Sequence, residues 1–463
     1  MLDHLIEESG GSIAIHRVAK ADWPHWQAEL PPPARAWLDT TGFAAEPGAV
    51  ALVPGAGGAL GQVLVGVGPD EDAWLGAILA GRLPVGRYHL AQPIGPGPAR
   101  RFCLSWLLAG YGFRRYKSKA ARPWPSLVRP AGADRAWIEA AAEATVLVRD
   151  LINTPAADMG PNDLAAAAET LAARFGAGLR VIVGDGLLAE TYPAIHAVGR
   201  AAVHPRQPRL IDLVWGDEAA PRLTLVGKGV CFDSGGLDLK SSANMKLMKK
   251  DMGGAAHVLG LALMVMAAGL PVRLRVLIPA VENVVAGNAM RPLDVLSTRK
   301  GLTVEVGNTD AEGRLILCDA LAEAARDNPA LLIDMATLTG AARTALGTEL
   351  AALFCNDDAL AAELVQAGEA ECDPMWRLPL HRPYRRLLDS KVADIANVSD
   401  GPHAGAITAA LFLQEFVPDT VPWAHFDIMA WNGSSRPGRP DGGEAMALLA
   451  IFSVISRRFG TNV

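Results

Sequence analysis

Gly307-Asn308-Thr309-Asp310-Ala311-Glu312-Gly313-Arg314-Leu315 is the stretch around which this chain is organised. It contains two carboxylates two residues apart, with a glycine on each side of the pair and an arginine directly after the second glycine. Residues 302–306 before it alternate as a half-buried strand does, and apolar residues follow at helical spacing, at Leu317, Ala320, Leu321 and Ala324. The carboxylates are therefore expected at a strand-to-helix turn, where open α/β sheets bind ligands and a helix amino terminus favours anions.

Two interpretations fit this stretch. The oxygens of Asp310 and Glu312 are hard ligands that would bind a divalent cation, and Arg314 would strengthen an anion site beside it. Alternatively, one of the two carboxylates merely caps the helix that follows. Taken alone, the stretch leaves both interpretations open.

A second stretch, residues 226–240, reads Val-Gly-Lys-Gly-Val-Cys-Phe-Asp-Ser-Gly-Gly-Leu-Asp-Leu-Lys, and residues 249–254 continue it with Lys-Lys-Asp-Met-Gly-Gly. Together the two stretches resemble the leucyl aminopeptidase family, the cytosolic two-metal aminopeptidases of peptidase family M17. The resemblance extends over about residues 149–430 and is weakest in the amino-terminal region. It also includes Asn153-Thr154-Pro155 and the segments 279–283, 336–340 and 404–410.

The resemblance implies two divalent metal ions per subunit. Its motif gives the ligands as Lys228, Asp233, Asp251, Asp310 and Glu312, with Asp233 and Glu312 bridging the ions. A lysine binds metal only as the neutral amine, which requires a pKa strongly lowered by burial and by the cation. Alone, Gly-Lys-Gly is more typical of a surface turn. A set of carboxylates and an amine accepts zinc or manganese, and magnesium and cobalt are further candidates.

The same resemblance gives two catalytic side chains, Lys240 and Arg314. As a cation, Lys240 would polarise the scissile carbonyl and stabilise the oxyanion of the tetrahedral intermediate. Arg314 would hold a bicarbonate that acts as general base toward the metal-bridging water. Without the family motif, either residue would be interpreted as half of a surface salt bridge.

The resemblance also implies a pocket for the first residue of a peptide, lined by Met248, Asn308, Thr337, Leu338, Gly340 and Met429. The family usually has a smaller residue at position 429, and the segment 431–447 replaces its usual ending. We expect Met429 to narrow the pocket, so that leucine and similar apolar residues are preferred over large aromatic ones.

Other classes of function remain as alternatives. A two-metal phosphoesterase also uses clustered carboxylates, and a retained fold could act as a non-catalytic scaffold. A serine protease is excluded, since Ser234 in Asp-Ser-Gly-Gly lacks the all-β pattern and a matching histidine segment. No His-x-x-x-His pair occurs among the ten histidines, which excludes a zincin.

Composition bounds the fold and the partners. A chain of 463 residues, half of them hydrophobic, predicts two domains with a large interior. A net charge of −6 argues against nucleic acid as a partner. Five cysteines without metal-ligand spacing predict reduced thiols, and the acidic amino terminus predicts no export. The longest apolar run, 258–270, is too short to span a membrane. We expect a cytoplasmic protein.

We predict two α/β domains. Residues 1–130 would form a small non-catalytic domain with strands at 49–53 and 63–67, in which the glycines of 55–61 make a hairpin and not a nucleotide loop. Residues 131–153 would be a linker helix, and 154–463 the catalytic domain, with a mostly parallel central sheet flanked by helices. Family members are hexamers, and by resemblance we expect a homohexamer here.

Overall fold

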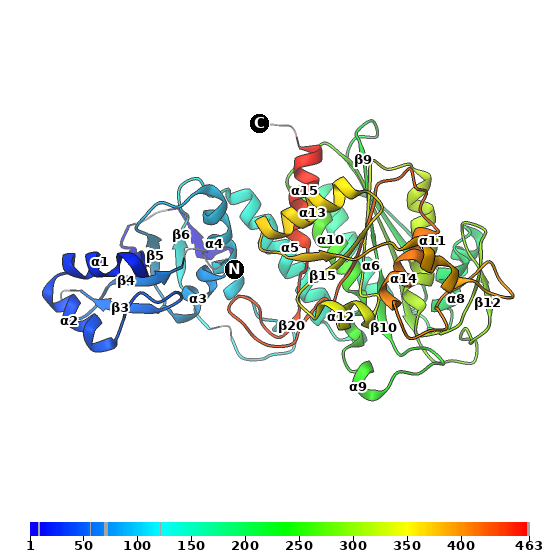
Figure 1. The fold of residues 1–463 in the computed structure, drawn as a ribbon, viewed down its shortest axis with the longest axis horizontal. Helices are drawn as coiled ribbons and strands as arrows, with labels where there is room; N and C mark the ends of the chain where they lie inside the picture. The colour runs from blue at the N-terminus through cyan, green and yellow to red at the C-terminus, as the bar shows by residue number, and fades with distance from the viewer. Residues whose placement is uncertain (8–9, 56, 69–72, 121, 461–463) are drawn as a thin grey trace. The chain divides into compact units, whose positions relative to one another are not determined.

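The computed structural model describes residues 1–7, 10–55, 57–68, 73–120 and 122–460. They form two compact units (Figure 1). Unit 1 contains residues 1–146 together with the returning segment 434–441, and unit 2 contains residues 147–433 and 442–463. Each unit has its own sheet, so the expectation of a two-domain α/β protein is confirmed.

Unit 1 is built on a six-stranded sheet with the order β1-β6-β5-β2-β4-β3. All neighbours in it are parallel except β3 and β4. Its strands are β1 (Leu5–Ile6), β2 (Ile13–Ala19), β3 (Val50–Pro54), β4 (Leu60–Val67), β5 (Arg87–Leu90) and β6 (Ser126–Val128). Its helices are α1 (Trp23–Glu29), α2 (Pro32–Thr41), α3 (Leu75–Arg82) and α4 (Pro96–Ala109).

The glycine-rich segment after β3 is a hairpin connection, as predicted. Strands β3 and β4 pair antiparallel on either side of it, and the Gly55 amide donates to the Ala59 carbonyl at 2.7 Å. Ala56 lies outside the described residues. The hairpin joins two strands without a helix, so this segment lacks the strand-to-helix turn that a dinucleotide loop requires.

Strand β6 lies just before the predicted domain boundary at residue 130 and pairs with both β1 and β5. It is not among the strands predicted for residues 1–130, which are those at 49–53 and 63–67. A strand of three residues is too short for alternation to mark it. The following helix is as expected: α5 runs from Arg135 to Asn153, and the Asp134 carboxylate caps it by accepting from the Trp137 amide.

Unit 2 is built on a nine-stranded sheet with the order β16-β15-β18-β14-β9-β11-β8-β7, to which β10 adds by pairing with β11. The central strands β18, β14, β9 and β11 run parallel to one another. On either side of them, β8 pairs antiparallel with β11 and β15 pairs antiparallel with β18. The strands are β7 (Gly178–Val183), β8 (Arg209–Trp215), β9 (Arg222–Gly227), β10 (Gly229–Asp233), β11 (Arg273–Asn283), β14 (Leu331–Ala336), β15 (Ala351–Cys355), β16 (Met375–Arg377) and β18 (Trp423–Asp427).

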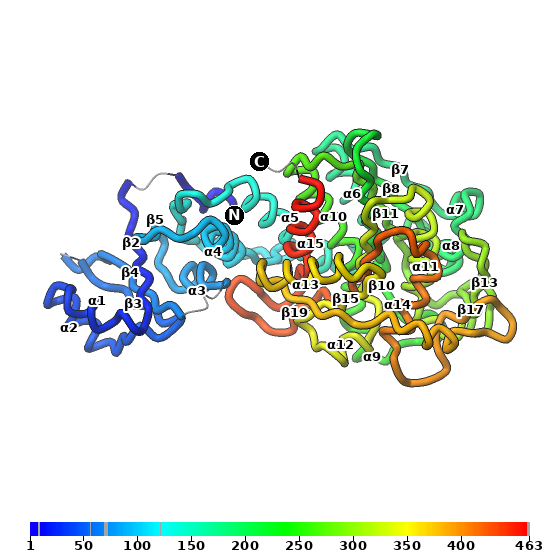
Figure 2. Tube along the Cα trace, turned by 45° about the horizontal axis from the view of Figure 1, so that its top comes forward, coloured from blue at the N-terminus to red at the C-terminus, as the bar shows by residue number. Residues whose placement is uncertain are grey.

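Helices cover both faces of this sheet (Figures 1 and 2). On one face α10 (Gly253–Ala267) packs on β9 and β14, with α6 (Pro161–Phe175) and α15 (Leu448–Phe459) beside it. On the other, α11 (Glu312–Arg326) packs on β9 and β11, with α8 (Pro193–Gly199) and α14 (Gly405–Gln414). Helix α13 (Asp358–Ala370) lies against α15. The mostly parallel sheet flanked by helices is therefore confirmed.

Two smaller sheets complete unit 2. The predicted strand at 302–306 forms as β13 (Thr303–Glu305), but it pairs with β12 (Val295–Ser297) and β17 (Ile395–Ala396) and not with the central sheet. The alternation of burial in three residues specifies a strand but not its partner. Strands β19 (Trp431–Asn432) and β20 (Gly442–Gly443) form the other sheet.

The apolar run at 258–270 is helical up to Ala267, in α10, whose residues from Gly253 to Met266 are all buried. Among the described helices, none combines the length and the apolar character that crossing a bilayer requires. Cys103, Cys231, Cys318 and Cys355 are buried, Cys372 is exposed, and all five thiols are free.

Candidate active site

The site lies where the central parallel strands of unit 2 end. Lys228 stands between β9 and β10, and Asp233 ends β10. Thr337 follows β14, the parallel neighbour of β9, and Glu312 begins α11. Asp251 lies in the short helix η4 (Met248–Met252) that leads into α10. Carboxyl ends of parallel strands meet at one edge of a sheet, which explains how distant segments bring their side chains together.

Lys228 is the buried centre of one half of the site. Its Nζ lies 2.9 Å from Asp251 Oδ2 and 3.0 Å from Glu312 Oε1, and it donates to the Thr337 carbonyl at 2.9 Å. Gly313 makes this position possible, because a Cβ there would lie 2.5 Å from Lys228 Cε. The chain therefore needs glycine after Glu312 to seat the lysine.

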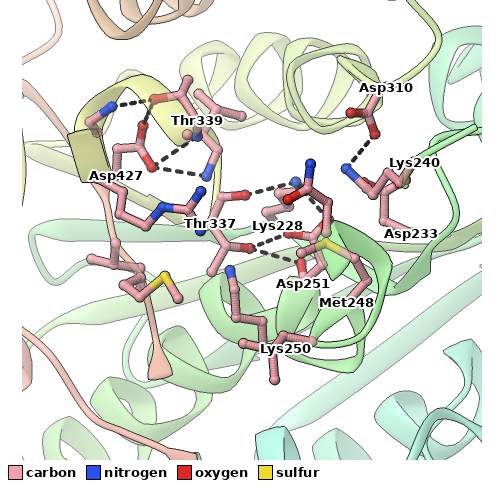
Figure 3. Close-up of a pocket in the computed structure, with 18 of the residues that line it drawn as sticks. Lys228, Asp233, Lys240, Met248, Lys250, Asp251, Asp310, Thr337, Thr339 and Asp427 are labelled. Atoms are coloured by element: carbon pink, nitrogen blue, oxygen red, sulfur yellow. Dashed lines mark hydrogen bonds and ion pairs between the residues drawn. The ribbon is translucent and has the colours of Figure 1, made fainter. Parts of the chain in front are cut away.

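Lys240 organises the other half. Its Nζ lies 2.8 Å from Asp233 Oδ2 and also forms an ion pair with Asp310 Oδ1 (Figure 3). Asp233 is held from behind, since its Oδ1 accepts from the Gly235 amide at 2.9 Å and from Asn283 Nδ2 at 2.8 Å. Asp251 is fixed in a similar way by the Thr337 hydroxyl, which donates to Oδ1 at 2.7 Å.

The charged groups of the site shift one another's pKa values. Burial raises the pKa of Glu312, and the neighbouring carboxylate of Asp233 raises it further. Burial alone would lower the pKa of Lys228, but Asp251, Glu312 and Asp233 together raise it above its usual value. Burial would also lower the pKa of Lys240, but Asp233, Asp310 and Glu312 together raise it above its usual value. Lys228 can therefore serve as a neutral ligand only where cations compensate the charge of these carboxylates.

The arrangement fits divalent metal ions. Asp233, Asp310 and Glu312 each place one carboxylate oxygen within 4.8 Å of the others. Glu312 is 1 % exposed, and its Oε2 finds no hydrogen-bond partner among the described residues. An unpartnered buried carboxylate oxygen is costly, and a cation between these oxygens would satisfy it.

Arg314 lies apart from this cluster, on the first turn of α11. Its guanidinium is buried and donates from Nη1 to the Asn397 carbonyl at 2.6 Å, while Nε has no partner among the residues that the structure describes. Burial lowers the pKa of Arg314 to about 10. A buried guanidinium with a free N–H suits a small anion such as bicarbonate.

A cavity of about 250 Å³ opens beside the cluster and brings most of the predicted residues together (Figure 3). Its lining includes the predicted residues Lys228, Asp233, Lys240, Met248, Asp251, Asp310, Thr337, Leu338, Gly340 and Met429. Three predicted residues do not line it: Glu312, Arg314 and Asn308. The Asn308 side chain instead accepts from the Asp310 amide at 2.7 Å, so it shapes the turn that presents Asp310.

The cavity also contains polar residues that the sequence did not single out. Asp427 ends β18, and its carboxylate accepts from the amides of Leu338 and Thr339 and from the Thr339 hydroxyl, at 2.9, 3.2 and 2.6 Å. Lys250 lies in η4 next to Asp251, is 6 % exposed, and burial lowers its pKa to about 8. Its position after Lys249 was the only signal, and a pair of lysines is more typical of a solvated surface.

An α/β sheet that gathers carboxylates, two lysines and a buried arginine at one edge has the features of a metal-dependent hydrolase. Comparison with known proteins specifies it further. Residues 146–451 match the model of the cytosol aminopeptidase family catalytic domain, and residues 13–130 match that of the M17 aminopeptidase N-terminal domain. The chain belongs to the cytosol aminopeptidase family, M17.

Individual relatives agree with this membership. A probable cytosol aminopeptidase of Syntrophotalea carbinolica is 41 % identical over 368 residues, which cover 76 % of this chain and 73 % of the relative. The crystal structure of a cytosol aminopeptidase from Coxiella burnetii superposes with a TM-score of 0.95 at 48 % identity, covering 99 % of this chain and 100 % of that one. The bottromycin maturation enzyme BotP, in complex with Mn, gives 0.87 at 35 % identity, with 97 % and 99 % covered.

These findings define the enzyme class. The chain is a metallo-exopeptidase of the leucyl aminopeptidase type, a hydrolase with aminopeptidase activity.

Proposed function

We propose that this enzyme releases the amino-terminal residue, leucine or a similar apolar residue by preference, from short peptides. The observation that carries the proposal is the pairing of Lys228 and Lys240 with four carboxylates beside one residue-sized cavity. At about 250 Å³ the cavity is smaller than the roughly 300–1,000 Å³ of sites for drug-sized ligands, which suits a single residue of a peptide.

In this proposal five residues would hold two divalent ions: Lys228, Asp233, Asp251, Asp310 and Glu312. Bound there, the ions would supply Lewis acidity and lower the pKa of the water that attacks the peptide carbonyl. Zinc or manganese suits this set best, and magnesium or cobalt would also bind to it.

Two side chains of the protein assist the reaction in this proposal. Lys240 keeps its proton because Asp233 raises its pKa, so it donates to the carbonyl oxygen as negative charge develops there. Arg314 would hold a bicarbonate with its unpartnered Nε, and the bound anion would supply a general base beside the cavity. The free α-amine of the substrate is positioned by the carboxylate of Asp251.

The preference for the first residue follows from the apolar wall of the cavity. Met248, Leu338 and Met429 line it, and Thr337 and Gly340 complete the wall. Asn308 contributes through the turn that it stabilises. Because Met429 is large and flexible, medium aliphatic side chains should fit better than aromatic ones. A panel of aminoacyl amides tests this, and faster cleavage of phenylalanine or tryptophan amide than of leucine or methionine amide would contradict it.

We also propose a cytoplasmic homohexamer. The catalytic domain would span 154–463 and follow a linker helix at 131–153, and the domain at 1–130 would serve assembly without contributing to the chemistry. The five free thiols support a reducing compartment. Exposed apolar side chains on unit 2, among them Leu239, Leu293 and Val392, support a contact between subunits.

The direct test compares leucine p-nitroanilide with its amino-blocked N-acetyl form. An aminopeptidase cleaves only the substrate with a free amine, because that amine is part of what the site binds. Equal cleavage of both substrates, or cleavage of neither by metal-loaded protein, would refute the proposed function.

A further inference from the structure

One buried cation of the cavity takes no part in the chemistry described above. Lys250 projects from η4 into the cavity, and in Figure 3 its amine points toward Thr337. Lys250 is only 6 % exposed. Among the described residues, no hydrogen bond or ion pair reaches its ammonium. The residue is buried while its ammonium opens to the cavity, and an ammonium in so enclosed a place is normally paired.

The acidic residues of the cavity do not satisfy Lys250, because each has other partners. Asp233 and Asp310 face Lys240, and Asp251 faces Lys228 and Thr337. Both oxygens of Asp427 accept hydrogen bonds from residues 338 and 339. Arg343, which lines the same cavity and is exposed, adds a second positive charge without an ion pair in the described part of the chain.

The neighbouring residue, Lys249, has a hydrogen-bond partner within the protein. Lys249 Nζ donates to the Asn153 carbonyl at 2.6 Å and lies 5.6 Å from the centre of the Trp431 ring, and it does not line the cavity. The two adjacent lysines thus differ in their partners. Lys249 donates a hydrogen bond to the protein, whereas the ammonium of Lys250 is available to a ligand that enters the cavity.

We propose that Lys250 is a specificity-determining residue that admits peptides with an acidic first residue, glutamate above all. The inference rests on the proposed aminopeptidase function and extends its substrate class beyond apolar residues. The methylenes of a glutamate side chain would pass along Met248 and Met429, and its carboxylate would accept a charge-assisted hydrogen bond from Lys250. A leucine side chain uses the same apolar wall without reaching for the ammonium.

The test measures kcat/KM of the manganese-loaded enzyme for glutamyl, glutaminyl and leucyl p-nitroanilides. Lys250→Met keeps the length of the side chain and removes its charge. A hydrogen bond to a charged group is worth about 1.5–3 kcal/mol, so kcat/KM for the glutamyl substrate should fall on the order of 10- to 100-fold. The glutaminyl substrate should lose less, and the leucyl substrate should be unchanged or improved.

Two variants serve as controls. Lys249→Met removes the adjacent lysine, which faces the protein, and should move all three substrates alike. Lys250→Arg keeps a cation at this position and should therefore retain more of the glutamyl activity than Lys250→Met does. Equal losses on glutamyl and leucyl substrates, or equal losses on glutamyl and glutaminyl substrates, would overturn the inference while leaving the aminopeptidase function intact. Absence of cleavage of every free-amine substrate by the wild-type enzyme would instead refute the function on which the inference rests.

Discussion

Two lysines divide the carboxylates of the site between them, and their roles can be separated by substitution. Lys240→Ala should leave bound metal near the wild-type amount, because all five proposed ligands remain, and should lower kcat on the order of 100- to 1,000-fold through loss of the oxyanion partner. Asp310→Asn should lower metal content as well as kcat, since it removes a ligand charge. Metal analysis of the two purified proteins checks this. Equal metal loss in both would contradict the separation of ligands from catalytic side chains.

Gly313 is important because it has no Cβ, which leaves room for the side chain of Lys228. In Gly313→Ala the new Cβ would lie 2.5 Å from Lys228 Cε, in a fully buried site, so the lysine must move. We expect lower metal content and activity together with a stability loss of about 1–3 kcal/mol, as overpacking typically costs. The matched control is Gly287→Ala, where a Cβ meets nothing within 4 Å. Normal metal content and activity in Gly313→Ala, measured beside that control, would show that Lys228 tolerates displacement.

At the residue scale, a dense motif lets the sequence predict which side chains lie close together. Asp310 and Glu312 lie two residues apart at a strand-to-helix turn, so proximity in the chain reveals them. Asp427 could not be found in this way, because its partners at 338 and 339 are almost ninety residues distant and meet it only through the pairing of β14 with β18. Lys250 was not predicted as a site residue, because a charged residue in the sequence gives no sign of burial, which depends here on the packing of η4.

At the scale of elements, α10 carries a titratable group in the core. His257 is fully buried; its Nδ1 pairs with the Gly253 carbonyl at 2.6 Å, and its Nε2 accepts from the Met446 amide at 2.9 Å. This arrangement requires the neutral ring, since a proton on Nε2 would face an N–H. Burial accordingly lowers the pKa of His257 to about 4 from the ordinary 6.5.

A pH dependence of stability follows from this helix. With a lowered pKa in the folded state, the contribution of His257 to stability is fully present above about pH 6.5 and is lost as pH falls toward 4, at most about 3 kcal/mol. Denaturant unfolding at pH 7 and pH 4.5 should show a smaller acid loss in His257→Gln than in the wild type. Parallel losses in both proteins would contradict the assignment of this pKa.

The sequence predicts elements better than their partners. Alternating helices and strands from residue 154 onward specify the parallel centre of the sheet, because each connection is long enough for a helix. The antiparallel placement of β8 and β15 and the separate sheet that contains β13 could not be derived, since periodicity records the buried face of a strand and not its neighbour. Strand β6 was missed because it has three residues.

At the scale of the whole molecule, the division into two units has one feature that no local pattern reveals. The segment 434–441 belongs to unit 1 although unit 2 supplies the chain on both sides of it. Within unit 1, the Arg439 guanidinium lies 4.6 Å from the centre of the Trp74 ring, and a Cβ at Gly438 would lie 2.7 Å from that ring. The divergent tail after Met429 is therefore partly a component of the amino-terminal unit.

The proposed assembly makes a prediction at the same scale. Light scattering after size-exclusion chromatography should give a mass six times that of the chain, because the apolar side chains exposed on unit 2 would be buried between subunits. Leu293→Asp or Val392→Asp, which place charge on this surface, should reduce the mass. A monomeric wild-type protein at micromolar concentration would contradict the hexamer without affecting the account of the site.

Metal dependence on a free-amine substrate tests the central claim most directly. The protein is stripped of metal by a chelator, and hydrolysis of leucine p-nitroanilide is measured before and after manganese or zinc is added, with the N-acetyl substrate alongside. The account predicts no activity in the stripped protein, recovery with added metal, and no cleavage of the blocked substrate. Activity that persists without metal, or two bound metals without cleavage of any free-amine substrate, would contradict it.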